Sequence, residues 1–277
     1  MASCSYSLRF AGLHFRILAP QPLCLPENLR AFMVDEPFGH EPDWVIEIIF
    51  GSEHVAYTDA DHVKRFPWKD GEYFFRVVPT GRERICRLFV PLGIAERFCV
   101  NANWMLFLMM ERLLLPYGRI ILHSSAVIHK GEAILFTAPS GTGKSTQASL
   151  WESHLGAEII NGDKVIIHAD GGWPVAYGGP VAGTSRIFRD LQAPIKAIVY
   201  LRHGKNNEMT FLDQRHAFMA LYSQAVKSPN DQGFNEALIP LIAKIAEKVP
   251  VADYTCQPHF SAVEYLRNRL YSYQTDK

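Results

Sequence analysis

Short runs of alternating hydrophobic and polar residues, separated by turn residues, fill the first part of the chain. SYSLRFAGLHFRIL alternates loosely, and the pair DWVIEIIF and EHVAYT flanks Gly51-Ser52. A further pair, EYFFRVV and RICRLFV, flanks Pro79-Thr80-Gly81. Apolar runs joined by a few Gly- or Pro-containing residues are typical of β-hairpins. Residues 1 to about 95 therefore predict a small antiparallel β module.

A helix of roughly residues 96 to 115 is expected to follow and to end at Pro116, because proline lacks the N–H that a helix interior needs. With this helix, the β-rich N-terminal domain covers residues 1–116. Its apolar run WMLFLMM is far shorter than the ~20 residues that cross a bilayer. We therefore expect no membrane association.

The pattern changes after Gly118. RIILHSSAVI and AILFTA predict strands, and KSTQASLWESHL predicts a helix that ends at Gly156. AEII and KVIIHA predict strands on either side of Asn161-Gly162-Asp163, and IKAIVYL is apolar enough for a strand that is covered on both faces. Helical periodicity dominates the remainder. We predict an α/β domain over residues 117–277 with a helical C-terminal portion.

Composition and charge describe an ordinary globular protein. Lys+Arg and Asp+Glu are both 28, so no net charge attracts the chain to nucleic acid. The five cysteines show neither a C-x-x-C pair nor an even count, so no disulfide framework is indicated. A reducing cytoplasm is the expected compartment.

The segment TAPSGTGKSTQ lies directly between the predicted strand AILFTA and the predicted helix. It matches a Walker A phosphate loop, G-x-x-x-x-G-K-[ST], except that Ala138 stands at the first position. Such a loop holds phosphate with inward-pointing N–H groups and the positive end of the next helix. The expected nucleotide contacts are Ser140, Gly141, Thr142, Gly143, Lys144, Ser145 and Thr146. Lys144 supplies charge, and the Ser145 hydroxyl is the expected Mg²⁺ ligand.

APSGTGKSTQ resembles the loop of phosphoenolpyruvate carboxykinases and of the related HPr kinase/phosphorylase family. In LHSSAVIHKGEAILFTAPSGTGKS, His123 stands where those kinases carry a histidine before the loop. AEIINGDKVII stands where they carry a strand that ends in A-D-D-R-V. YGGPVAGTS looks like a drifted version of the GTPWSGK loop of a broader kinase group that is associated with peptide-modification gene clusters, with Thr184 at its lysine position.

This resemblance implies a carboxykinase-like mixed sheet with a phosphate loop, and a smaller β-rich N-terminal domain. It also implies ATP and Mg²⁺ as cofactors, Asp163 as the Mg²⁺-associated carboxylate, and catalytic roles for Lys144 and His123. Gly162 occupies the position of the family's general base. Asp163 could then serve both roles, or His123 could take the proton.

The implied activity is transfer of the γ-phosphoryl group of ATP to a hydroxyl, with serine of a peptide or protein as the leading acceptor. A small-molecule acceptor (a sugar, an amino acid or a nucleoside) and a catalytically weakened nucleotide-binding regulator are the alternatives. The resemblance also suggests a homo-oligomer.

For several residues, a structural role is an alternative to a functional one. His123 could be a core histidine, and Asn161 could orient a catalytic group or cap a turn. Arg186 and Arg189 could stabilise transition-state charge or be solvated surface residues. His129 precedes a glycine turn and is expected to face solvent.

Overall fold

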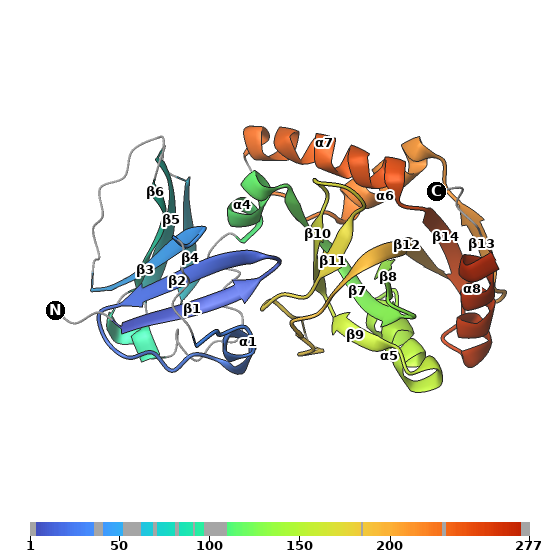
Figure 1. Cartoon of the computed structure of the whole chain (residues 1–277), viewed down its shortest axis with the longest axis horizontal. Helices are drawn as coiled ribbons and strands as arrows, with labels where there is room; N and C mark the ends of the chain where they lie inside the picture. The colour runs from blue at the N-terminus through green and yellow to red at the C-terminus, as the bar shows by residue number, and fades with distance from the viewer. Residues whose placement is uncertain are drawn as a thin grey trace. The chain divides into compact units, whose positions relative to one another are not determined.

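The chain divides into two structural units, Met1–Leu113 and Leu114–Lys277 (Figure 1). The computed structural model describes residues 4–35, 41–51, 62–68, 71–80, 83–90, 92–96, 110–183, 185–228 and 231–272. The predicted boundary between the domains, at residue 116, lies close to this division.

The first unit is built on a six-stranded sheet with the order β1-β2-β3-β6-β5-β4. Its strands are β1 (Cys4–Phe10), β2 (Leu13–Ala19), β3 (Trp44–Phe50), β4 (His62–Trp68), β5 (Gly71–Thr80) and β6 (Glu83–Val90). The short helices α1 (Glu27–Arg30), η1 (Leu92–Ile94) and α4 (Met110–Leu114) accompany them. Stacked rings of Phe10 and Phe15, with centroids 4.3 Å apart, belong to the core.

The prediction of a purely antiparallel module is wrong. The hairpins β1–β2 and β5–β6 are antiparallel as expected, but β3 pairs in parallel with both β2 and β6. A long connection that contains α1 precedes β3, and such a connection can return the chain in the same direction. EHVAYT and positions 97–109 of the predicted helix lie outside the described residues.

The second unit contains an eight-stranded mixed sheet with the order β11-β10-β7-β8-β12-β14-β13, and β9 also pairs with β7. The strands are β7 (Arg119–His129), β8 (Glu132–Thr137), β9 (Glu158–Asn161), β10 (Lys164–His168), β11 (Val175–Tyr177), β12 (Gln192–His203), β13 (Glu208–Phe211) and β14 (Val251–Cys256). β12 runs parallel to β8 and β14, whereas β7 runs antiparallel to β8, β9 and β10. The predicted mixed α/β fold class is confirmed.

Helices cover both faces of this sheet (Figure 1). Consecutive residues of β8 alternate between two core clusters, Leu135 in one and Phe136 in the other, so the clusters lie on opposite faces. The helices α6 (Gln214–Gln224) and α7 (Gln232–Lys248) pack on one face, and α5 (Lys144–Leu155) and α8 (Phe260–Ser272) pack on the other. The apolar stretch IKAIVYL forms the centre of β12, buried on both sides as predicted.

The topology brings two connections to one edge of the sheet. β8 and β9 both pair antiparallel with β7, so they run in the same direction. The glycine-rich loop after β8 and the turn after β9 therefore leave the sheet at the same edge.

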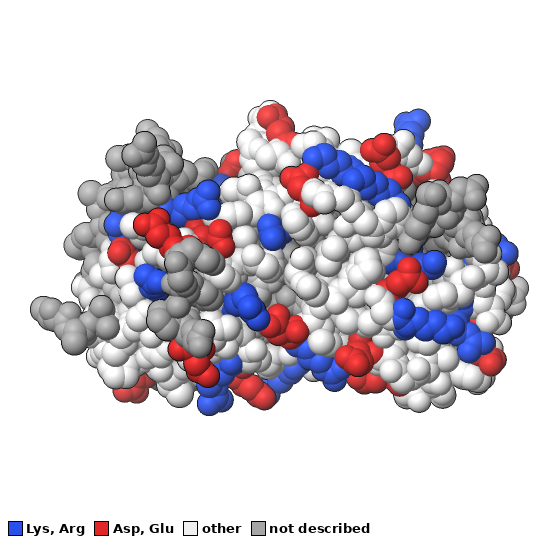
Figure 2. Space-filling view, viewed as in Figure 1, with Lys and Arg blue, Asp and Glu red and all other residues white. Residues whose placement is uncertain are grey.

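Within the described ranges, every helix is too short or too polar to span a bilayer. On the face drawn in Figure 2, basic and acidic side chains are interspersed.

Candidate functional site

The phosphate loop joins β8 to α5 and has the backbone geometry that its sequence requires. Gly141 and Gly143 have φ values of +82° and +95°, in the left-handed region that favours glycine. Gly143 is also the N-cap of α5 and offers no side chain to its first turn. The N–H groups at the start of α5 are thus left for an anion, next to the positive end of the helix dipole.

Ala138 explains why the missing motif glycine is tolerated. Its φ is not among the positive values, which in this loop fall at Gly141 and Gly143. Its methyl group is fully buried in the core cluster beneath α5. The first position of the loop therefore fills space in the core and needs no special backbone conformation.

The side chain of Lys144 folds back along the loop. Its Nζ donates hydrogen bonds to the backbone oxygens of Ala138, at 2.9 Å, and Pro139, at 3.2 Å. Only 6% of the residue is exposed, and burial lowers the pKa of the ammonium group, while nearby Asp163 opposes that shift. The lysine is thus a preplaced, poorly hydrated cation at the mouth of the amide-lined loop.

An acidic turn lies beside this loop. Gly162 and Asp163 connect β9 to β10. The backbone N–H of Ser124 on β7 donates a hydrogen bond to the backbone oxygen of Asp163 at 3.0 Å. His123, also on β7, lies opposite Lys164 in the ladder. Its Nε2 is 2.9 Å from Oδ1 of Asp163, and both side chains are 27% exposed. The hydrogen bond from His123 is the main cause that lowers the pKa of Asp163, so the carboxyl group stays ionised.

One hydrogen bond joins the loop to the turn. The hydroxyl of Ser145, in the first turn of α5, donates to the backbone oxygen of Gly162 at 3.2 Å. Ser145 and the adjacent Thr146 are exposed. The structure therefore brings the phosphate loop together with His123 and Asp163, although they come from different strands and connections.

Asn161 is fully buried and uses its whole side-chain hydrogen-bonding capacity. Its Oδ1 accepts from the backbone N–H groups of Asp163 and Lys164, both at 2.9 Å. Its Nδ2 donates to the oxygens of Gly179, at 3.2 Å, and Val181, at 2.9 Å. Of the two roles considered for Asn161, the turn cap is present, and the same contacts fix the backbone of Asp163.

The connection between β11 and β12 packs directly against the acidic turn. A methyl group at Gly183 would come within 2.8 Å of Cγ of Asp163, and one at Gly162 would meet the Ser185 hydroxyl at 2.0 Å. The place of a side chain at Gly162 is thus taken by Ser185. Apart from the small residues of GGPVAGTS, no sequence pattern pointed to Gly183 or Ser185, and Thr184 lies outside the described residues.

The other candidate residues, Arg186, Arg189 and His129, lie in different surroundings. Arg189 pairs with Glu152 on α5 at 3.4 Å, with both side chains well exposed, which fits the surface alternative. Arg186 is exposed and has a positive φ of 50°, uncommon for a residue with a side chain. The expectation that His129 faces solvent is wrong. Its ring packs edge-on against Trp151 and Tyr271, because both lie on helices that cover this face of β7.

Ser145 and Asp163 are a suitable pair of protein ligands for Mg²⁺. Both offer oxygen, which this hard cation prefers. Among the described residues, no group of three His, Cys, Asp or Glu side chains forms a complete metal cage. Mg²⁺ that accompanies a nucleotide is commonly held by one or two protein oxygens together with phosphate and water, so the residues present fit the ion.

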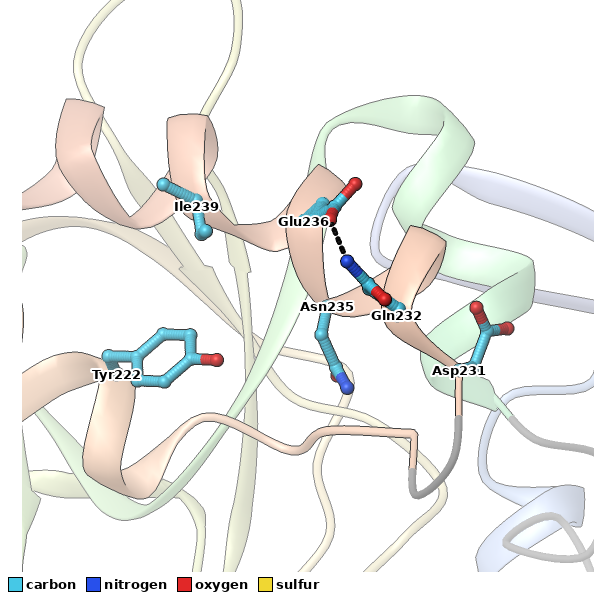
Figure 3. Close-up of a pocket in the computed structure, with 6 residues that line it drawn as sticks. All are labelled: Tyr222, Asp231, Gln232, Asn235, Glu236 and Ile239. Atoms are coloured by element: carbon cyan, nitrogen blue, oxygen red, sulfur yellow. Dashed lines mark hydrogen bonds between the residues drawn. The ribbon is translucent and has the colours of Figure 1, made fainter.

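A separate cavity of about 500 Å³ lies between α6 and α7 (Figure 3). It is lined by Tyr222, Asp231, Gln232, Asn235, Glu236 and Ile239. These helices pack on the sheet face opposite α5, and the cavity contains none of the predicted site residues. Its two carboxylates, Asp231 and Glu236, would repel phosphates, so the loop with the acidic turn is the better candidate for a phosphate site.

Comparison with known proteins gives distant likenesses among solved structures. No family model matches the sequence, and no curated protein does. The solved structure of the HPr(Ser) kinase/phosphatase from Coxiella burnetii is similar to part of this chain, with a TM-score of 0.34 and 11% sequence identity. The match covers 55% of this chain and 97% of that one.

Proposed function

We propose that the chain is an ATP-dependent phosphotransferase that moves the γ-phosphoryl group to a hydroxyl, with serine of a peptide or protein as the leading acceptor. The observation that carries the proposal is the hydrogen bond from Ser145 to Gly162. It joins a phosphate loop to a His–Asp pair at one sheet edge. Phosphoryl transfer needs mainly alignment and neutralisation of charge, and this edge offers groups for both.

The roles follow from the chemistry of each group. The N–H groups of the loop bind the phosphates, and Lys144 neutralises charge on the β- and γ-phosphates. Ser145 and Asp163 hold Mg²⁺, which supplies further charge neutralisation when it is bound. The acceptor oxygen forms a bond to the γ-phosphorus as the bond to the β–γ bridging oxygen breaks, and ADP leaves with that electron pair.

His123 is the proposed acceptor of the hydroxyl proton. Asp163 is kept ionised by its hydrogen bond with His123, and a carboxylate with a lowered pKa is a good metal ligand but a weak base. Histidine is the side chain most often used for general base catalysis, and the ring nitrogen of His123 that does not bond to Asp163 can accept a proton. Asp163 then orients the ring of His123 while it binds the metal.

The test is transfer from γ-labelled ATP with Mg²⁺ to serine peptides, with sugars, amino acids and nucleosides as parallel acceptors. Phosphorylated product is measured by mass spectrometry. Lys144→Ala should abolish transfer, and His123→Gln should lower kcat by about 10²–10⁴-fold while ATP still binds. Lys248→Ala, an exposed lysine at the end of α7, is the matched control. Full transfer by Lys144→Ala would refute the proposal.

A nucleotide-binding regulator without transfer activity is the second candidate. The absence of a side chain at Gly162, whose space Ser185 occupies, favours it. Binding of ATP without labelled product from any acceptor, and without faster ATP consumption when acceptors are added, would select this candidate over the phosphotransferase.

A further inference from the structure

The connection that packs against Asp163 is tied to the acidic turn mainly through one buried side chain. Asn161 donates to the oxygens of Gly179 and Val181 in the segment Gly178–Gly183, and it accepts from the N–H groups of Asp163 and Lys164. All four contacts are made by an amide that is 0% exposed. A buried amide with every donor and acceptor paired resists displacement, because each broken contact would leave an unpaired polar group.

The acidic turn and the connection that contains Gly178–Gly183 pack closely against each other. Gly183 lies so close to the carboxyl group of Asp163 that a methyl group would contact it at 2.8 Å. The N–H of Gly162 donates to the Ile187 oxygen at 3.3 Å, and the N–H of Arg189 donates to the Ile160 oxygen at 3.2 Å. The end of β9 and the first residue of the acidic turn are thus connected to residues Ile187 and Arg189 of the same connection between β11 and β12.

The phosphate loop does not share these contacts. Its tie to the turn is the hydrogen bond from Ser145 to the Gly162 oxygen, and Lys144 bonds within the loop itself. Nucleotide binding and placement of the acid therefore rest on different hydrogen bonds.

We infer that Asn161 is a positioning residue: it holds Asp163 and the segment Gly178–Gly183 in one fixed arrangement, and it serves the placement of the acid for the transfer step and not the binding of phosphates by the loop. This inference rests on the proposed phosphotransferase function.

Two variants with different physical effects test the inference. Asn161→Asp keeps the oxygen that accepts from the turn but places a second oxygen against the carbonyls of Gly179 and Val181. Gly183→Ala leaves Asn161 intact and pushes the segment away from Asp163. Both should lower kcat by about 10–100-fold, the usual effect of displacing a catalytic group by a fraction of an ångström to an ångström. The dissociation constant for ATP measured without Mg²⁺ should stay within about threefold of the wild type, because the loop and Lys144 are unchanged.

Asn206→Ala, at an exposed site between β12 and β13, and Gly233→Ala, where a methyl group fits in the first turn of α7, are the matched controls. If Asn161→Asp does not fold, Asn161→Ala takes its place in the kinetic test. Wild-type kcat in both Asn161→Ala and Gly183→Ala would overturn the inference. So would equal losses of ATP affinity and kcat, because Asn161 would then support the whole site.

Hydrogen–deuterium exchange gives a readout that does not depend on activity. Asn161→Ala should increase exchange in Gly178–Gly183 and in the turn that contains Asp163, without a change at the start of α5. If the wild type binds ATP but transfers nothing, the proposed function fails while this measurement still decides the inference. Unchanged exchange in Gly178–Gly183 would overturn it.

Discussion

At the scale of single residues, the site depends on where charges are held. Asp163 is approached by His123 at 2.9 Å, by Lys164 at 4.0 Å and by the backbone of Gly183. Lys144 lowers the pKa of Asp163 in turn, and Asp163 raises the pKa of Lys144 against the effect of burial. Opposite charges that are partly withdrawn from water stabilise each other, so Asp163 and Lys144 each favour the charged form of the other.

His129 supplies a prediction about pH. Burial, followed by the charges of Lys130 and Arg267, lowers its pKa below the usual value of 6.5. The unfolded chain therefore takes up a proton at a pH where the folded chain does not, and stability falls as the pH drops through 6.5 toward the lower pKa of the folded state. His129→Phe keeps a ring against Trp151 and removes this titration. We expect its melting temperature to fall less than that of the wild type between pH 7.5 and 5.5.

The control is His203→Gln, since His203 is an exposed residue at the end of β12. This variant should retain the pH dependence of the wild type. An identical fall in melting temperature for His129→Phe and the wild type would contradict the conclusion that the folded chain lowers the pKa of His129.

At the scale of elements, α7 carries a proline in its interior. Pro240 is exposed, and the helix continues from Gln232 to Lys248 by packing Leu238, Leu241 and Ile242 on the sheet. The ring removes one hydrogen bond to the preceding turn and crowds its carbonyl, which costs ~3 kcal/mol in an unadapted helix. Replacing the proline also gives the unfolded chain more conformational freedom. This entropy offsets part of the stability that the replacement adds to the folded helix.

Pro240→Ala should therefore raise the free energy of unfolding by about 1 kcal/mol, measured by urea denaturation. Glu247→Ala, an exposed position of the same helix, should change it by no more than about 0.5 kcal/mol. A loss of stability in Pro240→Ala would mean that the proline is needed for the path of α7.

Elements with strong periodicity were predictable, and those without it were not. KSTQASLWESHL matches α5 residue for residue, because a glycine in the left-handed region stands before it and another follows it. β13 and β14 were not predicted, since the four residues after β12 and the six residues between α7 and α8 give little pattern. The parallel pairing of β3 also escaped prediction, because hairpin signals describe neighbours in sequence and not strands joined by long connections.

The site was predictable where it is continuous in sequence. The loop motif located Lys144 and Ser145, and the spacing of the resemblance pointed to His123 and Asp163. The contacts of Asn161 and Gly183 depend on a connection about twenty residues further along the chain, which tertiary packing alone brings to Asp163. No local pattern encodes such a contact.

At the scale of the whole molecule, the unit Leu114–Lys277 contains two core clusters of its own and every predicted site residue. A unit with its own core is expected to fold independently. A fragment of residues 114–277 should therefore show a cooperative thermal transition by circular dichroism and bind Mg–ATP within about threefold of the full chain. A fragment that is unfolded at 25 °C would contradict this expectation.

The central claim is that the loop from Ser140 to Thr146 binds the phosphates of a nucleotide. Isothermal titration calorimetry of the full chain with Mg–ATP tests it most directly. We expect saturable binding that Lys144→Ala weakens by about 10–100-fold, the effect of losing one charged hydrogen-bonding partner, and that Lys248→Ala leaves unchanged. Absence of binding to ATP, ADP and GTP in the presence of Mg²⁺, or equal affinity in Lys144→Ala, would contradict the account.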